Sequence, residues 1–401
     1  MKVLWIVVDS MRADAPGYAG GPAITPTLDR LAAEGTRFSQ AHCSGSWTIP
    51  SLVAMDTAAF PHRVGVCNWG HRLPEGRASM LATFAEAGFT VRAFTPNPRW
   101  SLWGWPVPVR PGDSQDEQAL LAALREPGDA VFLIHHWSTH LPYVTKRRTW
   151  SGLKAAADMA IEALRAHPDA LAPKLRSLYH RAIGVFSEER LPRILDAAAA
   201  GGEDVLVALT ADHGENWGEC LPEGQRVAHI FDLHGRWLDD ATTHVPLLFW
   251  GTTRLGAVPG GHALGGFARG VDLGPTLCDA AGVPFRPTEG HPTSGISLLD
   301  ALHRSVDAPS AEALTVRSHN THQPDTYPED GRAMWRGYSL RTRSGRVTWD
   351  AFDDGPDGPD ALVARWHEAV GPLPVHTTPP HWTGDEAVLR ERLNKLGYWE
   401  P

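Results

Sequence analysis

Three residues that could bind a metal ion stand at the ends of two apolar runs. Residues 3–8 are apolar and precede Asp9, and the run at residues 205–210 is followed, after one alanine, by Asp212 and His213. Runs of this length with β-branched residues are typical of strands buried on both faces of a parallel sheet. Ligands of open α/β sheets bind at the carboxyl ends of such strands, so these three side chains should meet. Because converging carboxylates are costly to bury uncompensated, the sequence predicts a divalent cation there.

A hydroxyl group stands at the start of a predicted helix in residues 46–57. Thr48 precedes Pro50, which suits a first helical turn, and residues 51–57 continue in a helix-compatible pattern. The free N–H groups of a helix N-terminus suit an oxyanion of phosphate or sulfate. A threonine hydroxyl is a weak nucleophile at its free pKa, and metal coordination is one way to activate it. Thr48 is therefore a candidate nucleophile, with simple helix capping as the alternative.

Other polar and aromatic residues near these segments could contact a substrate. Trp47 is next to Thr48, and aromatic side chains commonly line ligand pockets. Asn97, between two prolines, carries an amide that could reach an anion. Of the adjacent His135 and His136, one is expected to pack in or behind the site rather than to bind the metal.

The elements that must position these residues follow an alternating order. Apolar runs at residues 89–94, 130–134 and 245–250 predict further strands, and helical patterns cover residues 27–38, 79–87 and 171–199. This alternation predicts a doubly wound, mostly parallel α/β sheet flanked by helices. The pattern fades near residue 308, so we expect a catalytic α/β domain at 1–308 and a smaller C-terminal α+β unit at 309–401. Strands are predicted there at 338–343 and 346–349, joined by a turn at Ser344-Gly345.

The composition excludes several classes of protein. A chain of 401 residues with a formal net charge of -9 lacks the basic face that nucleic-acid binding needs. Its four cysteines are scattered and form no CxxC pair, which argues against a zinc ribbon or a disulfide framework. The apolar run at the start is too short for a signal peptide, and no stretch is long and apolar enough to span a bilayer. We therefore expect a cytoplasmic protein with neither a nucleic-acid nor a membrane partner.

Several segments, in this order and spacing, resemble the sulfatase and alkaline phosphatase superfamily. They are residues 8–14, 25–32, the Thr48 segment, 60–66, 140–143, 210–215, His234-Gly235 with Asp240, 244–247 and 271–277. The resemblance implies an alkaline phosphatase-like fold and a metal-dependent enzyme that acts on an anionic ester.

The resemblance also implies a role for each matching residue. Asp9, Thr48, Asp212 and His213 would bind a divalent metal ion, and Thr48 would attack the substrate to form a covalent phospho- or sulfo-threonine intermediate. His140 and His234 match groups that bind the anionic oxygens or protonate the leaving group. His244 could assist them in substrate binding or belong to a second metal site.

Three positions depart from the pattern of the sulfatases that use formylglycine. Those enzymes need Cys or Ser where Thr48 stands and usually carry Arg where Leu52 stands. Threonine cannot become formylglycine, and threonine nucleophiles in the superfamily belong to phosphodiesterase-like, phosphonate-cleaving and phosphoglycerol-transferring branches. Ser10 occupies the place of a second acidic residue. Fewer carboxylates and one imidazole favour Mn²⁺ or Zn²⁺ over Ca²⁺.

Together these features predict a metal-dependent hydrolase, or a group transferase, that cleaves a phosphate-type ester or phosphonate through Thr48. The substrate would be a small anionic ester, with one bound ion expected. Two alternatives remain open at this point: an enzyme of sulfo groups that works without formylglycine, and a non-catalytic scaffold that retains the fold. The sequence does not set the oligomeric state.

Overall fold

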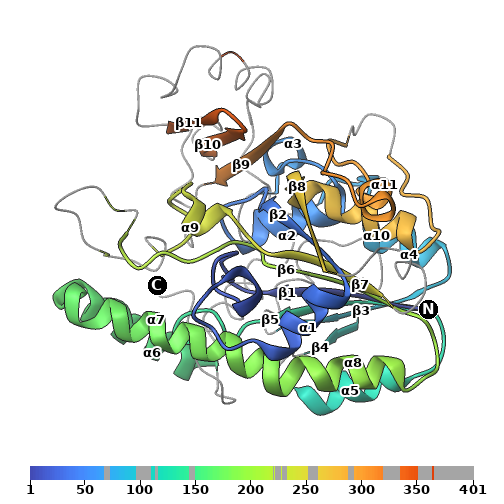
Figure 1. Cartoon of the computed structure of the whole chain (residues 1–401), viewed down its shortest axis with the longest axis horizontal. Coiled ribbons are helices and arrows are strands. Elements are labelled where there is room, and N and C mark those ends of the chain that lie inside the picture. Colours follow the sequence, from blue (N-terminus) through green and yellow to red (C-terminus); the bar gives the residue numbers. More distant parts are fainter. Residues whose placement is uncertain are drawn as a thin grey trace.

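The chain folds around a single large β-sheet (Figure 1). A computed structural model describes residues 1–66, 73–95, 110–112, 116–143, 150–219, 221, 227, 233–251, 261–287, 293–318, 335–350 and 364. The strand order of the eight-stranded sheet is β4-β3-β5-β1-β6-β7-β2-β8. Neighbouring strands are parallel except around β7, which is antiparallel to both β6 and β2. The predicted doubly wound, mostly parallel architecture is confirmed.

The strands have the following bounds: β1 Lys2–Val8, β2 Thr36–His42, β3 Thr90–Phe94, β4 Arg110–Gly112, β5 Ala130–His136, β6 Val205–Thr210, β7 Leu247–Gly251, β8 His262–Arg269, β9 Glu312–Ser318, β10 Trp335–Thr342 and β11 Gly345–Asp350. The α-helices are α1 Pro26–Glu34, α2 Thr48–Thr57, α3 Pro61–Val64, α4 Met80–Glu86, α5 Glu117–Arg125, α6 Trp150–Ala166, α7 Pro168–Val185, α8 Leu191–Ala199, α9 Asp240–Thr243, α10 Leu273–Ala280 and α11 Leu299–Arg304. Short 3₁₀ segments lie at Gly17–Ala19 and Gly270–Asp272, and a π-helical turn at Phe186–Arg190 joins α7 to α8.

Helices cover both faces of the sheet, and β1 shows why its sequence is apolar throughout. Alternate side chains of a strand point to opposite faces. Val3, Trp5 and Val7 pack in one core, and the residues between them pack in the other. The first core includes residues of α2, α4, α10 and α11, and the second includes residues of α1, α5, α6, α7 and α8. These two layers lie on opposite sides of the sheet in Figure 1.

The strand register brings three carboxyl ends to one edge of the sheet. Val7 of β1 pairs with His135 of β5 on one side and with Thr210 of β6 on the other. The residues that follow these strands therefore emerge side by side. The backbone N–H of Asp9 extends the ladder by donating to the carbonyl of His136, 2.9 Å away.

A small antiparallel sheet of order β11-β10-β9 packs beside the main one. The predicted hairpin is confirmed, since β10 and β11 pair from Thr342 and Gly345 outward. The division into units 1–308 and 309–401 stays a prediction, because much of the second unit lies outside the described residues.

One predicted helix, at residues 27–38, is too long. α1 ends at Glu34, and Gly35 has an extended conformation with φ −107° and ψ −159°. The next residues form β2, in which Thr36 and Phe38 are buried while Ser39 and Gln40 are exposed. Strands β2 and β8 were not predicted.

Candidate metal centre and nucleophile

Asp9 and Asp212 are held together by the backbone turn that follows β1. Both carboxylates are fully buried. Ser10 adopts a left-handed conformation with φ 58°, and its N–H donates to Asp212 Oδ1 at 3.1 Å. The Ser10 hydroxyl donates to Asp9 Oδ1 at 2.7 Å. A serine in this conformation is strained, and such strain often marks a functional site.

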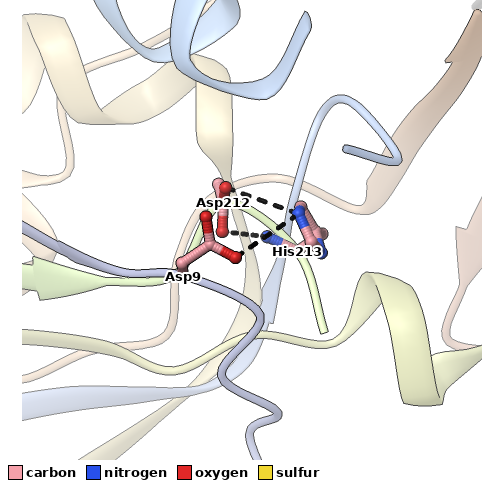
Figure 2. Close-up of side chains that lie close together, drawn as sticks. All are labelled: Asp9, Asp212 and His213. Carbon is pink, nitrogen blue, oxygen red and sulfur yellow. Dashed lines mark hydrogen bonds and ion pairs between the residues drawn. The ribbon is translucent and has the colours of Figure 1, made fainter. Parts of the chain in front are cut away.

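His213 completes the group from the loop after β6. Its Nε2 lies 3.4 Å from Asp212 Oδ2 and 4.0 Å from Asp9 Oδ1, and Figure 2 shows the three side chains converging. The Nδ1 of His213 lies 2.8 Å from the carbonyl oxygen of Gly214. A carbonyl only accepts, so Nδ1 carries the proton and Nε2 is left with its lone pair facing the carboxylates.

The charges at this point favour a cation. Burial raises the pKa of Asp9, but neighbouring histidines outweigh it and hold the pKa well below its ordinary value, so the carboxylate is ionised. Burial lowers the pKa of His213, yet Asp212 and Asp9 outweigh it and raise the net pKa. The lowered pKa of Asp9 and the raised pKa of His213 both indicate that the site stabilises positive charge beside His213 Nε2.

The donor atoms fit a divalent metal ion. One ligand atom from each of Asp9, Asp212 and His213 lies within 4.8 Å of the others. Asp212 Oδ2 is buried and has no hydrogen-bond partner among the described residues, which is unusual for a buried carboxylate oxygen unless a cation satisfies it. Two carboxylates, an imidazole and a nearby hydroxyl could all serve as ligands of a divalent ion.

Thr48, at the start of helix α2, lies beside these three side chains. It is the first residue of α2, and its Oγ1 lies 3.4 Å from His213 Nε2. The hydroxyl therefore stands at the N-terminus of a helix and beside the candidate metal ligands. Leu52, one turn further on, is fully buried. A hydroxyl in this position stands beside the backbone N–H groups of Thr48 and Ile49, which as the first residues of α2 have no acceptor within the helix.

Two histidines stand around His213. The ring of His234 stacks on the ring of His213 with centroids 4.5 Å apart, and His140 meets His234 edge to face at 5.0 Å. His140 Nδ1 lies 2.8 Å from the carbonyl oxygen of Leu141, so this nitrogen is the donor. Burial lowers the pKa of His140, which favours its neutral form. The structure thus brings both predicted histidines beside the metal ligands.

Glu215 is a buried group of this region that the sequence reasoning did not single out. Its Oε1 lies 3.0 Å from His234 Nδ1, and its Oε2 accepts a hydrogen bond from the Tyr143 hydroxyl at 3.0 Å. Burial raises the pKa of Glu215 to about 8. In the sequence, only its position directly after Asp212-His213-Gly214 indicated that Glu215 could belong to the site.

The comparisons with known proteins agree with this fold. The family model described as Sulfatase matches residues 2–106. The structure of BT1596, a 2-O GAG sulfatase, superposes with a TM-score of 0.65 at 16% identity over 99% of this chain and 92% of that one. The phosphonate monoester hydrolase of Agrobacterium radiobacter gives a TM-score of 0.66 at 17% identity over 99% and 95% of the two chains. The chain is thus similar to sulfatases over residues 2–106, and its overall fold is that of these two enzymes.

One relative of this sulfatase-like chain is named as a sulfotransferase. The low-salt glycan biosynthesis sulfotransferase Agl7 of Haloferax volcanii is 27% identical over 250 residues. The match covers 61% of this chain and 55% of the relative, so the chain spans about half the length of that protein.

The other predicted site residues either make contacts elsewhere in the fold or lie outside the described residues. His244 Nε2 lies 3.0 Å from the carbonyl oxygen of Ser39, and its ring stacks on His42 at 5.1 Å. Trp47 is 3% exposed and packs in the core on the α2 side of the sheet. Asn97 lies outside the described residues. Substrate binding by these three residues stays a prediction.

Among the described residues, no helix combines the length and the apolar content that crossing a bilayer would need.

Proposed function

We propose that this sulfatase-like chain is a metal-dependent hydrolase, or a closely related group transferase, that cleaves a phosphate-type ester or phosphonate through Thr48. One observation carries the proposal: Thr48 Oγ1 lies at the start of α2, 3.4 Å from His213 Nε2. A hydroxyl in that position can act as a nucleophile, whereas threonine cannot supply formylglycine.

The residues of the chain would divide the reaction between them. The Thr48 hydroxyl loses its proton to solvent water, its oxygen forms a bond to phosphorus, and the bond to the leaving group breaks. The backbone N–H groups of Thr48 and Ile49, at the start of α2, would stabilise the developing negative charge on the equatorial oxygens. His140 and His234 bind the anionic oxygens or protonate the leaving group. Water, or an acceptor hydroxyl in a transferase, then releases the group from Thr48.

A single divalent ion, Mn²⁺ or Zn²⁺ rather than Ca²⁺, would be held by Asp9, Asp212, His213 and Thr48. When bound, it supplies charge neutralisation and lowers the pKa of the threonine hydroxyl. The substrate is a small anionic ester, and a cytoplasmic location stays a prediction.

A second candidate function is sulfo-group chemistry without formylglycine. It is supported by the similarity to a protein named as a sulfotransferase. A non-catalytic scaffold is the less favoured alternative. Asp212 Oδ2, buried and without a hydrogen-bond partner among the described residues, would lower the stability of a protein that binds no cation.

Replacing Thr48 tests the proposal directly. We expect Thr48→Ala to lower turnover by about 10³- to 10⁶-fold, in the range seen when a covalent nucleophile is removed, with an unchanged circular dichroism spectrum. Thr48→Ser should retain part of the activity. Aryl phosphate mono- and diesters, an aryl phosphonate and an aryl sulfate would be compared, each with Mn²⁺, Zn²⁺ and Ca²⁺.

The matched control is Thr57→Val at the other end of α2, where the hydroxyl donates only to the carbonyl of Val53 at 2.7 Å. It should keep full turnover per folded molecule. Mass spectrometry of the acid-quenched enzyme should find the transferred group on Thr48. Unchanged turnover in Thr48→Ala would refute the nucleophile, and preference for the aryl sulfate would favour the second candidate.

A further inference from the structure

His135, the penultimate residue of β5, contacts the carboxylate of Asp9 at Oδ2. Its Nε2 lies 2.9 Å from Asp9 Oδ2 and 3.8 Å from Asp212 Oδ2. Its side chain is 1% exposed, and both aspartates are fully buried. The two oxygens of Asp9 therefore have different neighbours: Oδ2 faces His135, whereas Oδ1 lies 4.0 Å from His213 Nε2.

The hydrogen-bond partners of His135 fix where its proton lies. A ring nitrogen without a proton would turn its lone pair toward the ionised Asp9 carboxylate, which is repulsive at 2.9 Å. Nε2 therefore carries the proton and donates it to Oδ2. His135 Nδ1 then accepts, and the Thr95 hydroxyl lies 3.3 Å from it as a donor. Thr95 follows β3, the strand next to β5.

The candidate ligand set and the proton on Nε2 both argue against His135 as a metal ligand. The ligand atoms of Asp9, Asp212 and His213 lie within 4.8 Å of one another, and His135 does not belong to this set. A proton on Nε2 also leaves no lone pair for an ion.

We propose that His135 is a positioning residue that holds Asp9 through Oδ2, so that the carboxylate presents Oδ1 to the cation. This inference rests on the metal centre of the proposed function. Hydrogen-bonded partners orient metal-binding carboxylates, and their loss typically weakens metal affinity by about 10- to 100-fold. Thr95 supports the same arrangement by fixing the tautomer of His135.

Mn²⁺ binding to the full chain, measured by isothermal titration calorimetry at one pH, tests this role without any substrate. We expect His135→Ala to raise the dissociation constant by about 10- to 100-fold. His135→Gln keeps an N–H donor near the position of Nε2 and should restore affinity to within about threefold. Thr95→Val, which conserves shape, should weaken binding less than His135→Ala does.

The matched control is His136→Gln, the neighbouring residue of β5. The His136 ring packs on Phe186 with centroids 4.5 Å apart. This variant should leave the dissociation constant unchanged even if it lowers stability. Thermal unfolding of each metal-free variant, followed by circular dichroism, reports stability separately.

Pulsed electron paramagnetic resonance of the Mn²⁺-loaded protein counts the imidazole nitrogens bound to the ion. One such nitrogen, from His213, is expected in both the wild type and His135→Gln. Two in the wild type and one in His135→Gln would make His135 a ligand and overturn the proposal. Unchanged affinity in His135→Ala, or in Thr95→Val if the alanine variant does not fold, would also overturn it.

Asp212→Asn separates this failure from failure of the metal centre. Weak Mn²⁺ binding in Asp212→Asn with normal binding in His135→Ala contradicts only the role of His135. Normal binding in Asp212→Asn contradicts the metal centre and the inference built on it.

Discussion

Glu215 shows how one side chain can depend on the fold for its charge. Its carboxyl group is fully buried between the Tyr143 hydroxyl and His234 Nδ1. The Tyr143 oxygen in turn accepts a hydrogen bond from Trp217 Nε1 at 2.9 Å. Burial disfavours the charged form, which is why the pKa of Glu215 rises from 4.5 to about 8. In the metal-free protein this group keeps its proton at neutral pH.

The raised pKa of Glu215 predicts a pH dependence of stability. A carboxyl group that binds its proton more tightly when folded stabilises the protein at low pH, and this contribution is lost as pH rises through about 8. Between about pH 5 and pH 8 the free energy of unfolding should fall by up to about 1.4 kcal/mol per pH unit relative to Glu215→Gln, whose amide cannot titrate. Urea unfolding of both proteins in EDTA measures the difference. Parallel pH profiles would contradict the prediction.

The sequence revealed only part of the site at this scale. Asp9, Asp212 and His213 could be placed together because parallel strands end at a common edge, whatever surrounds them. The roles of Glu215 and His135 depend on which side chains touch them. Those contacts come from Tyr143, His234 and Thr95, which stand on separate segments, so no local pattern predicts them.

Helix α2 owes its position to a close approach of the chain at Gly45. A Cβ atom on Gly45 would lie 2.5 Å from the Ser51 backbone N and 2.7 Å from the Pro50 carbonyl carbon. Those are backbone atoms of the first turn of α2, so they cannot rotate away. The absence of a side chain at Gly45 is what lets the loop pass beneath the helix that carries Thr48.

Gly45→Ala should therefore displace Thr48, the proposed nucleophile. We expect the first turn of α2 to shift, turnover to fall by at least about 100-fold, as small misplacements of reacting groups can cause, and stability to fall by about 1–3 kcal/mol. Turnover per folded molecule and urea unfolding measure these effects. The control is Gly76→Ala, where the added Cβ meets nothing within 4 Å and only the backbone conformation, φ +73°, is strained. Equal turnover in the two variants would show that the contact beneath α2 is unimportant.

Elements differed in how well the sequence predicted them. β1, β5 and β6 are apolar along their length because helices cover both faces, so their patterns were clear. β2 alternates less regularly, with exposed Ser39 and Gln40, and β8 contains Gly265 and Gly266. Strands near the edge of a sheet meet fewer neighbours and carry weaker patterns. Neither strand was predicted, and the first residues of β2 were assigned to a helix.

On the scale of the whole molecule, the small sheet is joined to the nucleophile segment by several hydrogen bonds. Val316 of β9 donates to the carbonyl of Ser44 and accepts from the N–H of Ser46, both at 3.1 Å. The Thr315 hydroxyl donates to the carbonyl of Cys43 at 2.6 Å. The segment that leads into Thr48 is thus bordered by β9. The sequence predicted the α/β class and the later hairpin, but not this contact, since residues so far apart carry no shared local signal.

This connection predicts that the small sheet and the main sheet unfold together. Native-state hydrogen exchange in mild urea, followed by mass spectrometry, should give the same opening free energy for peptides from β6 and from β10. Thr315→Val should lower both values alike by about 1 kcal/mol through loss of a buried hydrogen bond. Two separate opening energies, with only the β10 value changed by the variant, would indicate independent units.

The reversed direction of β7 has a consequence for how such molecules can diversify. β6 ends and β7 begins at the same edge, because Thr210 pairs with Leu247. The excursion between them, which supplies Asp212, His213, Glu215 and His234, therefore departs from and returns to the rim without traversing the sheet. Lengthening it would reshape the walls around an incoming molecule while every strand kept its partner. Selection could thus change what is accepted and leave the scaffold beneath it untouched.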